Sequence, residues 1–585
     1  MKIKLPILLS LFFIYTAFSQ QAQKNYEATQ RHLINANLSP VNDGTDDLVI
    51  ASNQFTPTAP VSEPVLKRVT SDGSLVWSKN YDNTTLANAR FFDIANYFDL
   101  IYATGSIDVN NVKKVFIARI EASSGNLLAA EYYDVVNANF NSRGFKILTT
   151  DSDATGDTNP NAGVLVTGFF SSCFNFDNTC NINIGFAIRT DLNLNILWSV
   201  EVDSSVTGNN DFDFINGAVE TNDGFLLTGS ANHLDNGANK AAVLAHKLDF
   251  EGNFVWDNSY FFGNSRDISV DAYYDTVSDE IYLLSNYSAF HHFGVTVLDN
   301  NTGAIDFNKT WYVNEVNFEL DFYGFSILES LSNTNNLLVY GYRKNYFNGT
   351  SNDQSNVIVH EFEKNTGNQV GTSYQYLLPF QETAGDEFSF WNSPTFPQMP
   401  EIYYPDMAVN DNDATTTAQY TVGYREGDPA NGSFGNIEFF KIENQKTNVC
   451  DNISIDYTTN AINSVTPIST NILSGSTPVT GNTMSFNPAN LALIVDSCDP
   501  TFSVNDPSKV NSIIYPNPSS SYVFINKQDN IINVSIYDVS GKKIYNTKSY
   551  DKDQGIYIGD LQKGIYFMSF KTDGFISKSF KIIKK

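Results

Sequence analysis

The sequence predicts an all-β protein, in which a seven-bladed β-propeller is followed by a small Ig-like β-sandwich. Two observations predict this organisation. A block of short strands recurs seven times between residues 20 and 460, and the charge changes sign after residue 510. We therefore expect four parts: a leader over 1–19, the propeller over 20–460, a post-propeller segment and linker over 461–510, and a terminal domain over 511–585.

The first nineteen residues have the pattern of a secretory signal peptide. Lys2 and Lys4 precede an apolar run over 5–15, and small residues stand before a cleavage point between Ser19 and Gln20. The run is shorter than a membrane-spanning helix, and no stretch of eighteen apolar residues follows it. We therefore predict an exported chain without a transmembrane segment.

Seven segments share the pattern of a second strand, an aliphatic run that ends on small residues and mostly on glycine. A repeat of roughly fifty to eighty residues with four short strands cannot bury both faces of its sheet alone, so the repeats must stack. A closed ring of seven sheets meets this need, with its first strand near 32–38 and its last near 453–457. The seven segments are 48–52, 101–105, 165–168, 226–229, 282–285, 338–341 and 420–423.

The third strand of the repeat carries two columns of charged residues, and the fourth strand often carries a tryptophan. Residues two positions apart on a strand share one face, so we expect the two columns to pair with each other and to serve the structure rather than a reaction. The basic column is Arg68, Arg119, Arg189, Lys247 and Lys441, the acidic column is Glu121, Asp191, Asp249, Asp299, Glu363 and Glu443, and the tryptophans are Trp77, Trp198 and Trp256.

The segment from the third to the fourth strand, as in 248–256, resembles the structural repeat of quinoprotein-like propellers. The resemblance implies the fold but not a quinoprotein reaction, because those cofactor sites need cation ligands and often a vicinal disulfide, and no two cysteines are adjacent here. The Asp-box of sialidases, S-x-D-x-G-x-x-W, is not matched either, since segments 71–77 and 249–256 have different spacings. We therefore predict no catalytic residues.

The end of the sequence holds four motifs in a fixed order. They are Tyr-Pro-Asn-Pro at 515–518, a strand and Gly-Lys-Lys turn over 534–543, the strand entry 564–567, and a basic end over 580–585. Together they resemble the type A C-terminal sorting domain carried by cargo of the type IX secretion system of Bacteroidota. The resemblance implies that the secretion machinery handles residues 511–585 and that the protein reaches the cell surface or is released.

The charge of the terminal domain agrees with a separate module. Eleven lysines and six aspartates give residues 511–585 a net charge of +5, against −28 for the whole chain, which leaves −33 on the remaining residues. An ordinary Ig-like binding domain is the alternative. Strand patterns alone do not separate the two, whereas the Tyr-Pro-Asn-Pro opening and the basic end favour the sorting domain.

Four cysteines in an exported chain are expected to pair. We predict two bridges, Cys173 with Cys180 and Cys450 with Cys498. By loop entropy the first contributes roughly 2.5 kcal/mol to stability and the second roughly 4 kcal/mol. The second should tie the apolar run 491–495 onto the last blade, where the ring closes. Metal binding by the cysteines is the alternative, although no Cys-x-x-Cys pair supports it.

A short acidic segment is a candidate calcium site. Asp151, Asp153 and Asp157 alternate with other residues around a glycine, and a hard cation prefers several carboxylates around a tight turn. The twelfth position of this segment is Ala162 rather than the closing glutamate of an EF-hand. A plain polar hairpin loop is the alternative.

An insertion in the sixth connection, near residues 388–405, is rich in aromatic residues and proline. Trp391, Phe396, Tyr403 and Tyr404 are predicted to form a ligand rim, because exposed aromatic rings suit sugars and long ordered loops often carry function. The alternative is that these side chains cap a hydrophobic core.

The composition narrows the class of partner. The acidic chain does not favour nucleic acid, because phosphate binding needs cationic charge. We predict a secreted or surface-attached protein that acts by binding or adhesion, with a glycan or a protein as ligand and no cofactor apart from the candidate calcium ion. The alternative is an extracellular propeller hydrolase or lyase that acts on polysaccharide.

Overall fold

The computed structural model describes most of residues 23–498 and 513–585, and every regular element in these residues is a β-strand. The chain divides into two compact units, Met1–Asp499 and Pro500–Lys585. Outside the described residues are 151–161, 172–182, 205–212, 346–354, 378–406, 410–418, 426–435, 443–451 and 499–512, the ends of the chain before residue 23, and shorter loop segments.

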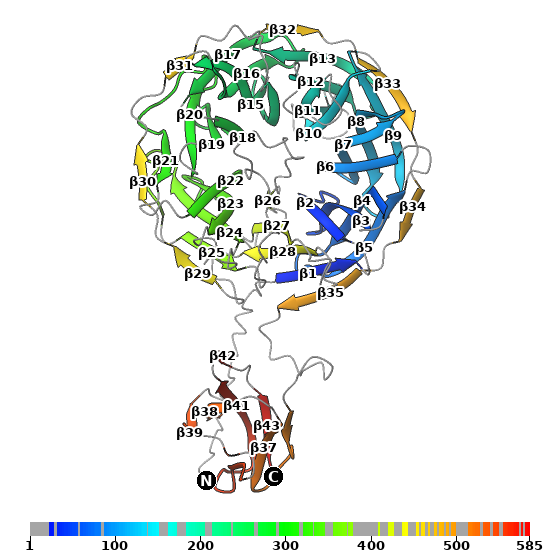
Figure 1. The fold of residues 1–585 in the computed structure, drawn as a ribbon. Helices are drawn as coiled ribbons and strands as arrows, with labels where there is room; N and C mark the ends of the chain where they lie inside the picture. Colours follow the sequence, from blue (N-terminus) through cyan, green and yellow to red (C-terminus); the bar gives the residue numbers. More distant parts are fainter. Residues whose placement is uncertain are drawn as a thin grey trace, which may run out of the picture. The chain divides into compact units, whose positions relative to one another are not determined.

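The first unit is a β-propeller, as the sequence predicts. In the part of the chain that the structure describes, seven antiparallel sheets of five strands each stand around a ring (Figure 1). In sheets 1 to 6, four strands follow one another along the chain from the inner to the outer edge. They are β2 (His32–Pro40), β3 (Leu48–Thr56), β4 (Ala59–Val69) and β5 (Leu75–Asp82) in sheet 1; β6 (Ala87–Tyr97), β7 (Leu100–Val109), β8 (Val112–Glu121) and β9 (Leu127–Val135) in sheet 2; β10 (Asn141–Thr150), β11 (Gly163–Ser171), β12 (Asn183–Asp191) and β13 (Ile196–Asp203) in sheet 3; β14 (Phe214–Thr221), β15 (Gly224–Asp235), β16 (Ala238–Asp249) and β17 (Phe254–Phe261) in sheet 4; β18 (Asp267–Asp275), β19 (Glu280–Tyr287), β20 (His292–Asp299) and β21 (Trp311–Asn314) in sheet 5; and β22 (Leu320–Glu329), β23 (Asn336–Asn345), β24 (Ser355–Glu363) and β25 (Ser373–Leu377) in sheet 6.

A strand from the other end of the chain completes the seventh sheet, which we call the closing sheet. β26 (Met407–Val409), β27 (Gln419–Arg425) and β28 (Asn436–Ile442) are followed by β1 (Gln23–Ala28), which pairs antiparallel with β28. The prediction that residues 453–457 supply this strand is wrong. Closure by β1 makes the first and last parts of the unit share one sheet, so the ring does not end in two open edges.

Residues 452–498 form a belt of seven short strands on the outside of the ring (Figure 1). Each belt strand pairs antiparallel with the outermost strand of one sheet. The structure therefore differs from the predicted boundary at residue 460, because the segment expected to follow the propeller adds strands to it. Strands of three to six residues without sustained alternation give no clear sequence signal. They are β29 (Asn452–Ile455), β30 (Thr458–Ala461), β31 (Thr466–Ile468), β32 (Leu473–Ser476), β33 (Val479–Met484), β34 (Asn487–Asn490) and β35 (Leu493–Cys498).

The repeated glycine of the second strand is explained by a bulge in the first strand. In sheets 2, 3 and 4 the register of the first two strands shifts beside this glycine. A Cβ atom on Gly105, Gly168 or Gly229 would lie 1.8, 1.8 or 1.9 Å from a carbonyl oxygen of the first strand. A larger residue would push the two strands apart, so the glycine column follows from the bulge.

The hydrophobic core of the ring lies between neighbouring sheets. Val49 of sheet 1 belongs to one buried cluster with Phe91 and Phe116 of sheet 2, and Ile50 belongs to another with Phe439 of the closing sheet. Both faces of sheet 1 are therefore buried. This arrangement absorbs many of the aromatic residues that make up 14% of the chain.

The second unit is a small β-sandwich, also as predicted. One of its sheets has the order β36-β37-β40 and the other has the order β39-β38-β41-β42, with β43 paired to β41. Val523, Ile536, Met568 and Ile582 are among the residues buried between them. The strands are β36 (Ile513–Tyr515), β37 (Tyr522–Asn526), β38 (Ile531–Tyr537), β39 (Lys543–Thr547), β40 (Ile556–Tyr557), β41 (Gly564–Thr572), β42 (Phe575–Ile576) and β43 (Phe580–Lys584).

Candidate functional site

The antiparallel order of the strands gives the ring two faces. Turns from the first to the second strand and from the third to the fourth strand lie on one face, which we call the turn face. Hairpins from the second to the third strand, and the connections into the next sheet, lie on the other, which we call the loop face. The two faces differ in chemistry.

The tryptophans of the fourth strand bridge neighbouring sheets at the turn face. Each donates its indole N–H to a backbone carbonyl in the turn that follows the third strand of the next sheet, over 3.1, 3.0 and 2.8 Å in Trp77–Ala122, Trp198–Phe250 and Trp256–Asn300. The glycine of the same turn packs on the ring: a Cβ atom on Gly303, whose φ is +67°, would lie 2.6 Å from the Trp256 indole. The tryptophan and turn-glycine columns therefore hold sheets together.

The basic column has a structural role, as expected, but the described bonds of Arg68 and Asp249 do not join the two columns. Arg68 lies 2.9 and 2.7 Å from the carboxylates of Asp43 and Asp47, which stand in the turn before the second strand of its own sheet. Asp249 accepts the backbone N–H of Asn253 in its own turn over 2.7 Å. A short turn needs a local acceptor for its N–H groups, and this requirement explains the acidic residue at this position.

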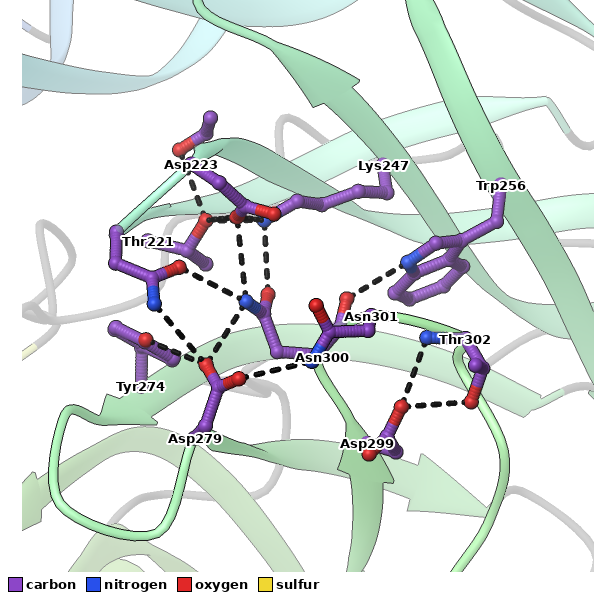
Figure 2. A network of polar contacts seen from close by, with 12 residues as sticks. Thr221, Asp223, Lys247, Trp256, Tyr274, Asp279, Asp299, Asn300, Asn301 and Thr302 are labelled. Atoms are coloured by element: carbon purple, nitrogen blue, oxygen red, sulfur yellow. Dashed lines mark hydrogen bonds and ion pairs between the residues drawn. The ribbon is translucent and has the colours of Figure 1, made fainter.

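Sheets 4 and 5 show the most extensive lock at the turn face, centred on Lys247 (Figure 2). The fully buried Lys247 ammonium donates to Thr221 Oγ1, to Asp223 Oδ1 at 2.7 Å and to Asn300 Oδ1 at 2.8 Å. Burial lowers the pKa of Lys247, while Asp223 and Asp279 act in the opposite direction. Because these bonds use all three protons of the ammonium, the group has no donor left for a ligand.

The outer side of this lock is a set of hydrogen bonds around Asp279. Asn300 and Asn301 donate to its two carboxylate oxygens over 3.0 and 2.9 Å, and the Tyr274 hydroxyl donates over 2.7 Å (Figure 2). The bond from Tyr274 is the largest cause that holds the pKa of Asp279 below its usual value. These four residues belong to sheet 5, and Asn300 also bonds to Lys247 and Asp223 of sheet 4, so the network joins the two sheets.

The loop face carries a group of basic residues at sheets 2 and 3, which we call the cationic cluster: Arg90, Lys113, Lys114 and Arg143. Two bonds fix the start of β8 against the start of β10. The backbone N–H of Lys113 donates to Asn141 Oδ1 over 2.8 Å, and Lys114 Nζ donates to the Phe140 carbonyl over 3.1 Å. These bonds place the two lysines beside Arg143.

The cationic cluster brings four basic side chains together at the loop face. Lys113 lies 3.1 Å from Asp108, and Lys114 lies 2.9 Å from Asp134. Burial is the largest cause that lowers the pKa of Lys113; repulsion from Arg143 comes next and Arg90 adds to it, whereas Asp108 opposes them. Lys113 therefore lies within electrostatic range of two other cations, in a unit with many excess acidic residues.

The two arginines stand where the repeat otherwise has apolar residues. Arg90 and Arg143 precede the bulge of the first strand in sheets 2 and 3. The same register position holds Phe214 in sheet 4, Ile268 in sheet 5 and Tyr323 in sheet 6. None of the four cluster residues is among the sites predicted from the sequence, and the departure from the repeat is the signal in the sequence that marks the two arginines. Exposure differs within the cluster: Lys114, Arg143 and Lys113 are 1%, 5% and 9% exposed, whereas Arg90 is half-buried.

The residues predicted as sites fall almost entirely outside the described part of the chain. This holds for the calcium candidates, the aromatic rim and three cysteines; of the fourth, Cys498, the structure describes the backbone at the end of β35. Within the described residues, no group of three or more His, Cys, Asp or Glu could hold a metal ion. The residues outside are Asp151, Asp153, Asp157, Trp391, Phe396, Tyr403, Tyr404, Cys173, Cys180 and Cys450.

In the second unit, two of the predicted motifs meet in space. Asn517, from the Tyr-Pro-Asn-Pro opening, donates to the Lys581 carbonyl over 2.7 Å and accepts the N–H of Ile583 over 2.9 Å. Ser519 and Lys585 extend this pairing along the last residues of the chain. Tyr515 stays half-exposed beside them. The opening motif and the basic end therefore form one continuous structure.

The solved structures that align with this chain have low sequence identity to it and low TM-scores. A structure described as the mitotic checkpoint complex is 10% identical, with a TM-score of 0.37, and covers 76% of this chain and 98% of its own. The Dos1 propeller is 8% identical (TM-score 0.36; 71% and 95% covered), and the WD40 domain of SCAP from fission yeast is 8% identical (TM-score 0.33; 80% and 94% covered). No curated protein matches the sequence.

The family comparison identifies the C-terminal unit. Residues 513–585 match the secretion system C-terminal sorting domain, which agrees with the four motifs and with the pairing of Asn517. The described residues contain no helix that is long and apolar enough to cross a membrane. The chain therefore carries a type IX C-terminal sorting domain and is a β-propeller protein exported to the cell surface or the extracellular space.

Proposed function

We propose that the propeller unit is an extracellular binding module that holds an anionic polysaccharide at the cationic cluster. The observation that carries this proposal is the replacement of an apolar register position by Arg90 and Arg143 in two neighbouring sheets. Guanidinium groups in place of apolar side chains give these two sheets the chemistry that recognises carboxylate or sulfate groups.

The chemistry of the cluster suits such groups. A guanidinium group can donate two parallel hydrogen bonds to one carboxylate or sulfate, and lysine adds a compact positive charge. The ion pair of Lys113 with Asp108 and the bond from Lys114 Nζ to the Phe140 carbonyl hold the two ammonium groups in place before a ligand arrives. Little side-chain entropy is then lost on binding, which favours affinity.

The acidic remainder of the unit favours a sparsely charged ligand. With −33 outside the terminal domain, a dense polyanion such as nucleic acid is repelled over most of the surface. At physiological salt this repulsion is screened beyond about 8 Å, so one acidic sugar can still reach the cluster. A glycan with occasional uronate or sulfate groups fits this balance better than nucleic acid does.

The aromatic rim and the calcium candidate extend this proposal. The segment that joins β25 to β26 contains Trp391, Phe396, Tyr403 and Tyr404, and we propose that it adds stacking surfaces for sugar rings. The calcium candidate, Asp151 with Asp153 and Asp157, could supply a cation for the same class of ligand. The hydrolase alternative needs a pair of carboxylates placed on a scissile bond, whereas the cluster offers mainly cations.

Calorimetric titration of the secreted protein with an alginate oligosaccharide, a sulfated oligosaccharide and a neutral dextran oligosaccharide tests the proposal. We expect binding of an acidic glycan but not of dextran, with an affinity that falls as salt is raised. Arg90→Gln should weaken it about tenfold, the loss of one charged hydrogen bond. The matched control is Lys309→Gln, which removes the same charge from an ion pair with Glu280 at the turn face.

Thermal unfolding of both variants shows whether the fold is kept. Equal affinity for dextran and the acidic glycans, or an equal loss in the two variants, would contradict the proposal. Release of reducing ends during the titration would instead favour the hydrolase alternative.

A further inference from the structure

The belt follows the ring in the opposite direction to the sheets. It begins with β29 on sheet 6 and continues with β30 on sheet 5, β31 on sheet 4 and β32 on sheet 3. It then reaches sheets 2 and 1 with β33 and β34 and ends with β35 on the closing sheet. One continuous segment thus visits all seven sheets once (Figure 1).

The ring is complete before the belt is added. Sheets 1 to 6 each have four consecutive strands, and the closing sheet obtains its fourth from β1. The belt strands come after these elements in the chain and pair with the outer edge alone. Folding of the ring therefore does not need a belt strand inside any sheet.

We propose that the outer edges of the seven sheets form one continuous docking surface for an extended polypeptide, and that the belt is a separable strap that docks on it after the ring has closed. The occupant is residues 452–498 of this chain. The proposal is independent of the ligand at the loop face.

The lengths of the strands explain how such a strap is held. Each belt strand has three to six residues, so a single strand–edge pair is weak. The strands are joined by short connections, and once one is docked the next is held at high effective concentration near its own edge. Seven weak contacts in series then bind as one unit, and they are also released as one unit.

The outer strands carry exposed apolar side chains next to the residues that pair with the belt, and these side chains indicate what kind of edge the belt covers. In sheet 1 the described belt pairs cover Lys79–Asp82, and Val76, which lies before them in β5, is half-exposed. Leu128 in β9 and Leu197 in β13 have the same position and similar exposure. A bare edge with apolar side chains invites pairing with other chains, so the strap should protect the ring from association.

Hydrogen exchange of the intact protein tests separability. We expect the backbone amides of β29–β35 to exchange as one group, at a common opening free energy below that of the amides of β7 and β8 in sheet 2. Belt amides that exchange together with those of β7 and β8 would show that the belt is part of the cooperative core. Belt amides without protection would show that it is not docked. Either result overturns the proposal.

A variant that lacks residues 452–498 but keeps the sorting domain tests the docking surface. We expect it to fold, to melt at a lower temperature and to self-associate. A synthetic 452–498 peptide should bind it and reverse both effects, whereas a scrambled peptide of the same composition should not. A folded variant that melts like the parent, or that does not bind the peptide, would contradict the proposal; if the variant does not fold, hydrogen exchange of the intact chain decides.

Discussion

The propeller unit and the sorting domain use their recurring residues for different ends. In the propeller, residues of the glycine, tryptophan and basic columns make contacts between strands and between sheets, as in Trp256–Asn300 and Lys247–Asp223. In the sorting domain, Asn517 joins the opening motif to the last strand and leaves Tyr515 half-exposed. Repeated residues of the propeller therefore serve its assembly, and the binding function that we propose lies where the propeller departs from its own repeat.

Removal of the sorting domain should have the largest effect of the changes that we predict, because it separates export from the fold of the propeller. Deletion of residues 513–585 removes the matched family segment but no strand of the ring. We expect the shortened protein to fold normally and to be absent from the cell surface and the medium, because the signal that the export machinery handles is gone. Fractionation with immunoblotting measures the location, and circular dichroism measures the fold.

A matched control is the variant that lacks residues 452–498. It keeps the sorting domain and should still leave the cell, although with a less stable ring. If the protein without residues 513–585 reaches the cell surface at normal levels, the export signal does not lie in this domain.

One buried histidine of the propeller should contribute to the pH dependence of stability between pH 6.5 and 4. His246 is fully buried between sheets 3 and 4, and burial lowers its pKa to about 4. Between pH 6.5 and 4 the unfolded chain binds a proton at this site and the folded chain does not, so stability falls as the pH falls through this range. The loss should reach about 3 kcal/mol at the acidic end.

Urea unfolding at pH 7 and at pH 4 measures this loss. The variant His246→Leu has no titrating group at the site, so its unfolding free energy should fall less between the two pH values. An identical fall in the parent and the variant would show that other groups cause the acid sensitivity.

The general class of the fold could be predicted because its cause is local. The bulge after Arg90 requires Gly105 beside it, and the turn at Gly303 packs on Trp256, so both leave a residue type at a fixed place in most copies. The closing strand and the belt could not be predicted in this way. β1 pairs with β28 and β35, which lie more than 400 residues away, and no local pattern records that partner.

The candidate site was harder to predict from the sequence than the fold was. The aromatic rim and the calcium candidate rest on composition, and they lie outside the described residues. Arg90 and Arg143 are conspicuous only after the register of the bulge aligns them with Phe214 and Ile268. A binding residue that interrupts a repeat needs the structure to show which position it interrupts.

Substitution of two buried lysines should distinguish a lysine that joins two sheets from a lysine that is only buried. Lys247 has a carboxylate and two other acceptors, whereas the described partner of Lys67 is the Ser52 hydroxyl at 2.5 Å, and burial lowers the pKa of Lys67 to about 7. Lys247→Met should destabilise the protein by about 2 kcal/mol, because Asp223 and Asn300 lose their partner. Lys67→Met should stabilise it by about 1 kcal/mol at pH 7, because a poorly compensated charge is removed.

Urea unfolding of both variants at pH 7 measures the two changes. If both substitutions change the free energy of unfolding in the same direction, the ion pair with Asp223 does not give Lys247 a different role in stability from Lys67.

The smallest expected difference in stability concerns the two predicted disulfides. One would enclose the belt, and the other would enclose a short loop. The belt runs from residue 452 to Cys498, and Cys450 precedes it by two residues in the sequence, so a Cys450–Cys498 bond would join the chain before the belt to its last strand. Its formation converts two thiols to a disulfide and passes two electrons and two protons to a disulfide oxidant of the periplasm. We expect the double change Cys450→Ser, Cys498→Ser to cost about 1.5 kcal/mol more than Cys173→Ser, Cys180→Ser, because the larger loop restricts the unfolded chain more. Differential scanning calorimetry of the two double variants measures this difference, and free thiols found by mass spectrometry of the secreted protein, or equal losses, would refute it.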